Sequence, residues 1–194
     1  MFLSGKHISR SNGVGFLINK PYAPLIDDYQ AISDRLAVLT LKTIFSKINL
    51  VQCYLPTSSY SVEDITDMYD QIEAVMDKVP KRDHLFIMGD FNAKLGGLNM
   101  DYPTAVGKHT TGKANERGEL LAKFCTRNNL IVTNTQFQKL YTWTSPDGKT
   151  KKQIDFILTQ NTSVRQAILD SSARNLLDIS DHKIDRIKVR FNFS

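Results

Sequence analysis

Leu85-Phe86-Ile87-Met88-Gly89-Asp90-Phe91-Asn92 is a short apolar run that ends in a glycine, an acid and an amide. Four consecutive apolar residues predict a strand buried on both faces. In open α/β sheets, ligands bind outside the carboxyl ends of the strands. A carboxylate at that place, with an amide two residues later, suits the activation of water and the binding of a hard cation. A strand followed by an Asx turn accounts for the same residues equally well.

Other apolar runs predict the remaining strands of an α/β protein. Those expected as strands are residues 13–18, 36–41, 48–54, 130–132, 141–144, 153–158 and 187–193, the second and third forming a hairpin. Residues 61–79 carry apolar side chains at the 3.6-residue period and predict an amphipathic helix that ends at Pro80. A second helix is expected to begin near Asn115, after a long loop of the kind that is often functional.

Length and composition favour one domain with its own core. The chain has 194 residues, of which 41% are hydrophobic and 23% charged, as in ordinary soluble proteins. The net charge of +5 and the pI of about 9.1 favour a polyanionic partner. No apolar run approaches transmembrane length and no signal peptide is visible, so we expect an intracellular protein that binds no membrane. Cys53 and Cys125 are expected to be buried free thiols.

Two familiar phosphate-binding and hydrolase motifs are excluded. Residues 107–113 match the first part of a P-loop, but Ala114 stands where the metal-binding hydroxyl residue must be, and no apolar strand precedes the loop. The chain also lacks a Gly-x-Ser-x-Gly serine-hydrolase motif. The fold class and the chemistry therefore depend on other motifs.

Three short motifs occur in a specific chain order. They are Gly89–Asn92, then Thr142-Trp143 with residues 154–158, then Ser180-Asp181-His182. Their combination resembles the endonuclease/exonuclease/phosphatase family, which comprises Mg²⁺-dependent phosphodiesterases. Within it, the chain is most similar to the craniofacial development protein 2-like proteins and to the endonuclease domains of non-LTR retrotransposons. The resemblance implies an α/β fold of two packed mixed β-sheets flanked by helices, a four-layer α/β/β/α sandwich.

The resemblance also implies roles for individual residues. Asp90 would help to generate the attacking hydroxide, and Asn92 would bind a phosphate oxygen or help to hold that site. His182 would contact the phosphate and stabilise the transition state, while Asp155 would pair with it. Tyr54 would direct its hydroxyl into the cleft. For Asp155 and Tyr54, a buried hydrogen-bonded group in a strand is the alternative.

The same resemblance implies a cofactor and a partner. Mg²⁺ (or Mn²⁺) would be bound by Asp90, Asn92, Asp181 and His182. DNA would be the substrate, which implies a nuclear location, and Trp143 is interpreted as a packing residue beside the site. Five lysines are candidates for contact with phosphates, although each could equally be a solvated side chain; they are Lys108, Lys113, Lys149, Lys151 and Lys152.

One departure from the family pattern concerns the start of the chain. Family members carry an earlier strand that ends in asparagine and a strand with a metal-binding glutamate, whereas no glutamate precedes Glu63 here. Residues 1–12 are expected to be irregular, followed by an N-terminally truncated domain over residues 13–194 that lacks its first strand-helix-strand unit. Two hypotheses follow: an endonuclease that nicks DNA, or an inactive remnant that binds nucleic acid or a protein.

Overall fold

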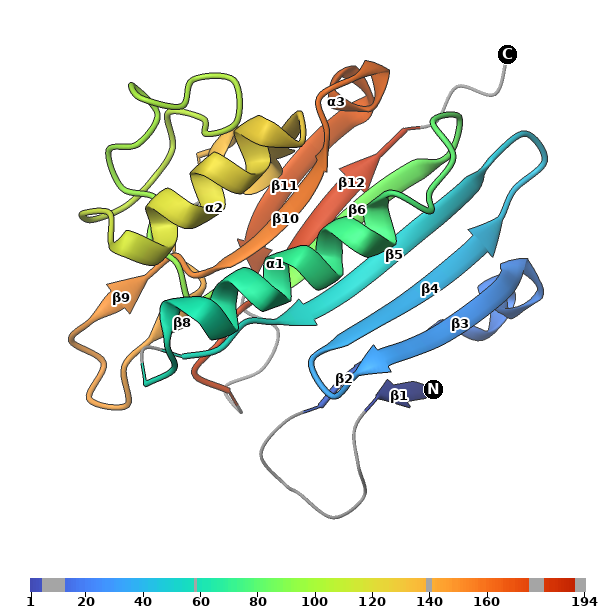
Figure 1. Ribbon diagram of the computed structural model, residues 1–194, viewed down its shortest axis with the longest axis horizontal. Helices are drawn as coiled ribbons and strands as arrows, with labels where there is room; N and C mark the ends of the chain where they lie inside the picture. The colour runs from blue at the N-terminus through green and yellow to red at the C-terminus, as the bar shows by residue number, and fades with distance from the viewer. Residues whose placement is uncertain (5–12, 58, 139–140, 175–179, 191–194) are drawn as a thin grey trace. The chain divides into compact units, whose positions relative to one another are not determined.

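The computed structural model describes the whole chain except residues 5–12, 58, 139–140, 175–179 and 191–194 (Figure 1). The contacts divide the chain into two compact units, Met1–Gly89 and Asp90–Ser194, where chain length alone predicts a single domain. Within the described part, no helix is long and apolar enough to cross a membrane. Both cysteines are buried, as expected, and no disulfide joins them within the described part of the chain.

The first unit is built on neighbouring strands in the order β3, β4, β5 and β6. Their bounds are Ile26–Ser33, Leu36–Lys42, Lys47–Tyr54 and His84–Asp90. The predicted hairpin is confirmed, since β4 and β5 pair antiparallel with Val38 opposite Val51. Buried and exposed side chains do not alternate at the start of β4. Its first four residues are all buried, which is typical of a strand covered on both faces; they are Leu36, Ala37, Val38 and Leu39.

The beginning of the chain is not irregular as predicted. Phe2–Ser4 forms strand β1, which pairs antiparallel with β2 (Val14–Phe16). Phe2 packs against a core that includes Phe16 and Leu39. Three residues are too few for a periodic signal, so this strand depends on pairing with β2. The remainder of the predicted irregular segment, residues 5–12, lies outside the described residues.

Helix α1 (Val62–Met76) is the predicted amphipathic helix. The Ser61 hydroxyl accepts a hydrogen bond from Asp64 N at 3.2 Å, and the Asp64 carboxylate accepts one from Ser61 N at 2.9 Å, which completes a capping box. The helix ends three residues earlier than predicted. Lys78 N and Val79 N bond three residues back, to Val75 O and Met76 O, so the chain tightens into a turn before Pro80.

Gly89 is the residue before Asp90 on β6, and both its backbone conformation and its surroundings require a glycine. Its φ is 151°, and a Cβ there would overlap the carbonyl of Cys53 on β5. Only glycine can combine that backbone conformation with such a close approach. The glycine before the acid is therefore a structural requirement of this strand end.

The described residues of the second unit form two α-helices, a 3-10 helix, several short strands and a packed loop. Helices α2 and α3 span Glu116–Arg127 and Ser163–Ala167, and the 3-10 helix η2 spans Thr133–Thr135. Strand β7 (Leu130–Val132) pairs antiparallel with β10 (Asp155–Gln160), and β11 (Ile168–Arg174) pairs with β12 (Ile184–Val189). A small hairpin joins β8 (Trp143–Thr144) to β9 (Lys151–Lys152).

Asn115 is the predicted cap of α2, and its side-chain oxygen accepts hydrogen bonds from Gly118 N and Lys94 N. The long loop before it is packed, because Leu95, Ala105 and Val106 are buried. The expected last strand begins earlier than residue 187, at Ile184, and residues 191–193 lie outside the described part of the chain.

Candidate active site

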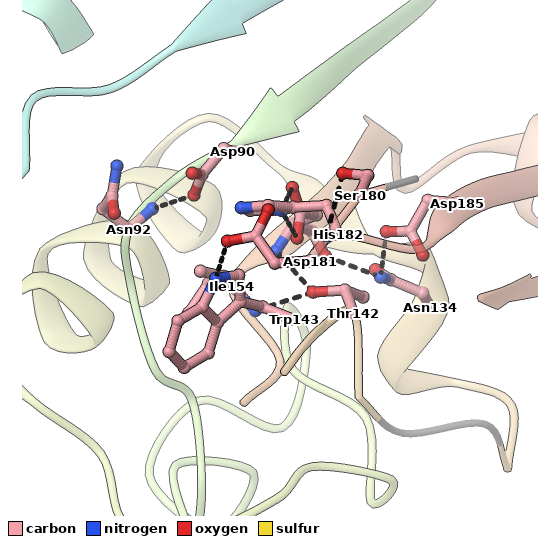
Figure 2. Close-up of polar contacts among 11 residues, drawn as sticks. Asp90, Asn92, Asn134, Thr142, Trp143, Ile154, Ser180, Asp181, His182 and Asp185 are labelled. Atoms are coloured by element: carbon pink, nitrogen blue, oxygen red, sulfur yellow. Dashed lines mark hydrogen bonds and ion pairs between the residues drawn. The ribbon is translucent and has the colours of Figure 1, made fainter. Parts of the chain in front are cut away.

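Three segments of the second unit bring together Asp90, Asp155 and His182 (Figure 2). Asp90 ends β6, Asp155 begins β10, and His182 lies just before β12. One potential ligand atom from each residue lies within 4.8 Å of those of the other two. The structure therefore places in one group three residues that the motifs place 65 and 27 positions apart in sequence.

Asp155 and His182 form a direct pair. His182 Nδ1 lies 3.0 Å from each carboxylate oxygen of Asp155. The hydrogen bond that His182 donates to the Asp155 carboxylate raises the pKa of His182 above its ordinary value, and burial opposes that rise. Thr142 fixes the start of β10, because its hydroxyl oxygen accepts hydrogen bonds from both Ile154 N and Asp155 N at 3.1 Å.

Asp90 is a buried carboxyl beside a second acid. Burial, and after it the charge of Asp155, raises the pKa of Asp90 to about 6. Asn92 N donates a 2.8 Å hydrogen bond to Asp90 Oδ1, which opposes the rise. Asn92 has a φ of 49°, a left-handed conformation that asparagine tolerates. At neutral pH the carboxylate is thus ionised and able to accept a proton from water.

Phe91 connects the two acidic segments. Its backbone N donates to Ile154 O at 2.9 Å, next to Asp155. Its buried ring lies 6.2 Å from the ring of Phe156. The contacts of Phe91 with Ile154 and Phe156 therefore hold the segment that carries Asp90 against the segment that carries Asp155.

Asp181 does not belong to the group of possible cation ligands found among the described residues. Its carboxylate accepts a 2.8 Å hydrogen bond from the indole N–H of Trp143. Trp143 is half-buried, and its backbone forms a bridge with His182. The sequence interpretation of Trp143 as a packing residue is thus incomplete, because the indole also orients the acid next to His182.

The described contact of Asn92 with the site is made by its backbone. Its backbone N faces Asp90, while Figure 2 shows its side chain pointing away from His182. Tyr54 ends β5 in the first unit, where the guanidinium of Arg35 lies 5.0 Å from its ring centroid. The predicted catalytic roles of Asn92 and Tyr54 remain predictions.

The predicted phosphate-binding lysines fall into two sets. Lys151 and Lys152 lie on β9, with their amino groups 4.7 Å and 4.6 Å from the ring centroids of Tyr141 and Trp143. Lys149 is exposed in the turn between β8 and β9. Lys108 and Lys113 are exposed on the loop before α2. The β9 lysines are thus placed beside the strand that bridges to His182.

Sequence reasoning missed two polar residues behind the site, Asn134 and Asp185. Asn134 Nδ2 donates to Asp155 O at 2.9 Å and to Asp185 Oδ2 at 3.0 Å. Both left a signal in the sequence. Asn134 comes two residues after the apolar run Leu130–Val132, and Asp185 falls on the inward face predicted by the alternation of Ile187 and Val189.

The donor set fits a divalent cation in part. The two carboxylates offer the oxygen ligands that Mg²⁺ and Mn²⁺ prefer, whereas the imidazole is a nitrogen ligand that Mg²⁺ does not favour. Asp155 directs both oxygens toward His182, so only Asp90 offers a carboxylate that is not engaged with the imidazole. These residues could hold one ion, with water or substrate oxygens completing its coordination.

Several known proteins resemble the chain. A family model described as endonuclease-reverse transcriptase matches residues 48–184. Craniofacial development protein 2 of Bos taurus is 33% identical over 98% of this chain and 32% of the relative. Its counterpart in Tragulus javanicus is 33% identical over 98% of the chain and 33% of the relative. The chain thus spans about a third of the length of these relatives.

Solved structures share the fold. The endonuclease domain of TRAS1, a telomere-specific non-LTR retrotransposon, has a TM-score of 0.60 at 20% identity, with 81% of this chain and 63% of that chain covered. The AP endonuclease LMAP from Leishmania major has a TM-score of 0.63 at 13% identity, over 82% and 56% of the two chains. The 3′ phosphatase NExo from Neisseria, bound to product DNA hairpin, has a TM-score of 0.60 at 15% identity, over 86% and 72%.

These likenesses confirm the predicted α/β fold class. The family model spans most of the chain, from β5 through the Ser180-Asp181-His182 motif, and so includes all three residues of the candidate site. This chain belongs to the endonuclease/exonuclease/phosphatase family.

Proposed function

We propose that the chain is a metal-dependent phosphodiesterase and that it nicks DNA. The observation that carries the proposal is the convergence of Asp90, Asp155 and His182 within 4.8 Å in the second unit. A base, a cationic donor and ligands for a hard cation are the components that phosphodiester hydrolysis requires.

The proposed roles of Asp90 and His182 in hydrolysis follow from their protonation states. Above pH 6 Asp90 is ionised and accepts a proton from the attacking water. Asp155 holds the Nδ1–H side of His182, so the cationic ring presents its Nε2–H to a phosphate oxygen and stabilises the charge of the transition state. A divalent ion held by Asp90, with water or phosphate oxygens completing its coordination, would neutralise phosphate charge and lower the pKa of a bound water. Asn92 and Asp181 are further proposed contributors to ion binding.

A DNA substrate is supported by charge and by relatives. Lys149, Lys151 and Lys152 place positive charge on the hairpin whose other strand bridges to His182. Phosphate contacts of this kind provide affinity without base specificity. The TRAS1 domain is an endonuclease, and the structure of NExo holds a DNA hairpin. A nuclear location for this chain follows from such a substrate as part of the proposal.

The test is the nicking of supercoiled plasmid by the purified chain. Nicking is expected with Mg²⁺ or Mn²⁺ and should be abolished by EDTA. Nicking that persists in EDTA, or none in either metal, would contradict the proposal. Triple replacement of Lys149, Lys151 and Lys152 by alanine should raise KM more than it lowers kcat, because these side chains are proposed to bind rather than react.

An inactive nucleic-acid-binding or protein-binding remnant is the second candidate. The observation that favours it is the donor set itself: among the described residues the possible cation group contains only two carboxylates, and Asp155 is engaged with His182. Filter binding to a DNA duplex at several salt concentrations would then show a log–log slope near −0.9 per phosphate contact, without cleavage. Cleavage in any divalent metal would rule this candidate out.

A further inference from the structure

Behind the Asp155–His182 pair, one carboxamide joins the two segments that carry it. Asn134 Nδ2 donates to Asp155 O at 2.9 Å and to Asp185 Oδ2 at 3.0 Å (Figure 2). Asn134 is 1% exposed and belongs to η2. We name the contacts of this side chain with Asp155 and Asp185 the Asn134 bridge. It spans from the first residue of β10 to the second residue of β12.

The Asn134 bridge lies at the starts of β10 and β12, whose relative position sets the distance between Asp155 and His182. His182 meets both carboxylate oxygens of Asp155 at 3.0 Å, a contact that depends on how the start of β10 lies against the start of β12. Asp185 lies three residues after His182, and its side chain is joined to the start of β10 through Asn134, which bonds to both segments. Because Asp185 and His182 are three residues apart on the same extended segment, a displacement of Asp185 would also displace His182.

Asp185 is costly for stability. Its Oδ1 atom is buried, and among the described residues it has no hydrogen-bond partner. Burial, followed by the charge of Asp155, raises the pKa of Asp185 to about 8. A buried polar atom without a partner destabilises a fold, and an apolar side chain of similar shape is often neutral or stabilising at such a place. Stability of the core therefore does not explain an aspartate at this position.

We propose that Asn134 and Asp185 are a positioning pair that holds Asp155 and His182 at hydrogen-bonding distance for hydrolysis. This inference rests on the proposed function. Neither residue touches the reacting phosphate. Removing a polar partner behind a catalytic group commonly lowers activity 10- to 100-fold.

A neighbouring residue provides a matched control. Thr133 is the adjacent residue of η2, and its hydroxyl contacts Ile157 O at 2.9 Å and Ser171 Oγ at 2.8 Å. This hydroxyl thus joins β10 to β11, and its described hydrogen bonds involve neither Asp155 nor Asp185. Thr133→Val should therefore weaken the same region of the fold and leave the pair in place.

The experiment compares Asn134→Leu, Asp185→Leu, Asp185→Asn and Thr133→Val with the native chain. Crystal structures give the distance from His182 Nδ1 to the Asp155 carboxylate, which does not require an active enzyme. Plasmid nicking gives kcat and KM, and thermal melting gives stability. The kinetic prediction is a kcat about 10- to 100-fold lower in both leucine variants, with KM little changed.

In both leucine variants the distance should exceed about 3.5 Å, beyond hydrogen-bond range. Asp185→Asn retains an acceptor for Asn134 and should keep both the distance and the activity. Asp185→Leu should melt at or above the native temperature while it loses activity, a combination that a purely structural residue would not give.

A pair still in contact near 3.0 Å in both leucine variants would overturn the proposal, as would an equal loss of contact in Thr133→Val. If the native chain shows no metal-dependent nicking, the proposed function fails, and the crystallographic distances alone then decide whether Asn134 and Asp185 position the pair.

Discussion

Replacement of Asp155 by asparagine should lower stability more at low pH than at high pH. The side chain keeps its shape and loses its charge. Two titrations then change together. His182 loses its ion pair, and Asp90 loses the like charge that is the second cause of its raised pKa.

The sign of each effect follows from the direction of the pKa shift. The pKa of His182 is raised above 6.5, so its stabilising contribution is complete below pH 6.5 and is lost as the pH rises through the folded-state pKa. The pKa of Asp90 is raised from 3.8 to about 6, so its destabilising contribution develops as the pH rises from 3.8 and is complete above about pH 6. Asp155 is thus stabilising in acid and a source of repulsion above neutrality.

The magnitude can be worked from the contact. A hydrogen bond to a charged group contributes about 1.5–3 kcal/mol and a neutral one about 0.5–1.5 kcal/mol. Asparagine can still accept from the imidazole, so Asp155→Asn should lose about 1–1.5 kcal/mol at pH 5. That corresponds to a fall of roughly 2–6 °C in Tm for a chain of this size. At pH 8 the contribution of the ion pair is smaller than in acid and the repulsion with Asp90 is relieved, so the expected loss is smaller than at pH 5.

Thermal melting followed by circular dichroism at pH 5 and pH 8, with EDTA present, measures the difference. Asp101→Asn is the matched control, because Asp101 is an exposed acid in the same unit. It should leave Tm unchanged at both pH values. Equal losses at pH 5 and pH 8 for Asp155→Asn, or a larger loss at pH 8, would refute the reasoning.

Three further variants test the fold and the site. Gly89→Ala should destabilise by about 3 kcal/mol or more in urea unfolding, because it adds both strain and overlap with the Cys53 carbonyl, whereas Gly148→Ala, at φ 72° in open space, should cost about 1 kcal/mol; similar costs would contradict the overlap. Ser61→Ala should lower the free energy of unfolding by about 1 kcal/mol through loss of the helix cap. An unchanged free energy of unfolding would show that the capping box does not stabilise α1. Trp143→Phe should lower stability by less than about 1.5 kcal/mol and free the Asp181 side chain in a crystal structure; an unmoved carboxylate would show that the indole does not orient it.

Sequence patterns predicted the elements that carry strong local signals. The apolar run ending in Gly89-Asp90 predicted β6, and the 3.6-residue period with Ser61 and Pro80 predicted α1. Strand β1 was missed because three residues give no period, and it forms only through pairing with β2. Local signals thus fail where an element exists because of a distant partner.

The sequence predicted which residues form the candidate site better than it predicted which contacts their side chains make. Motif order identified Asp90, Asp155 and His182, and the structure brings them together. Side-chain direction was not predictable: Asp181 turns to Trp143, 38 positions away, and Asp185 is bridged by Asn134, 51 positions away. Such contacts depend on strand register, which residue type alone does not encode.

The most direct measurement is the nicking rate of Asp90→Asn in Mg²⁺, compared with the native chain and with Asp101→Asn. The substitution is nearly isosteric and removes the carboxylate that is proposed to accept the proton of water. The account predicts a loss of at least about 10²-fold for Asp90→Asn, the usual contribution of a general base, and native activity for Asp101→Asn. Near-native nicking by Asp90→Asn would show that the chemistry lies on other residues.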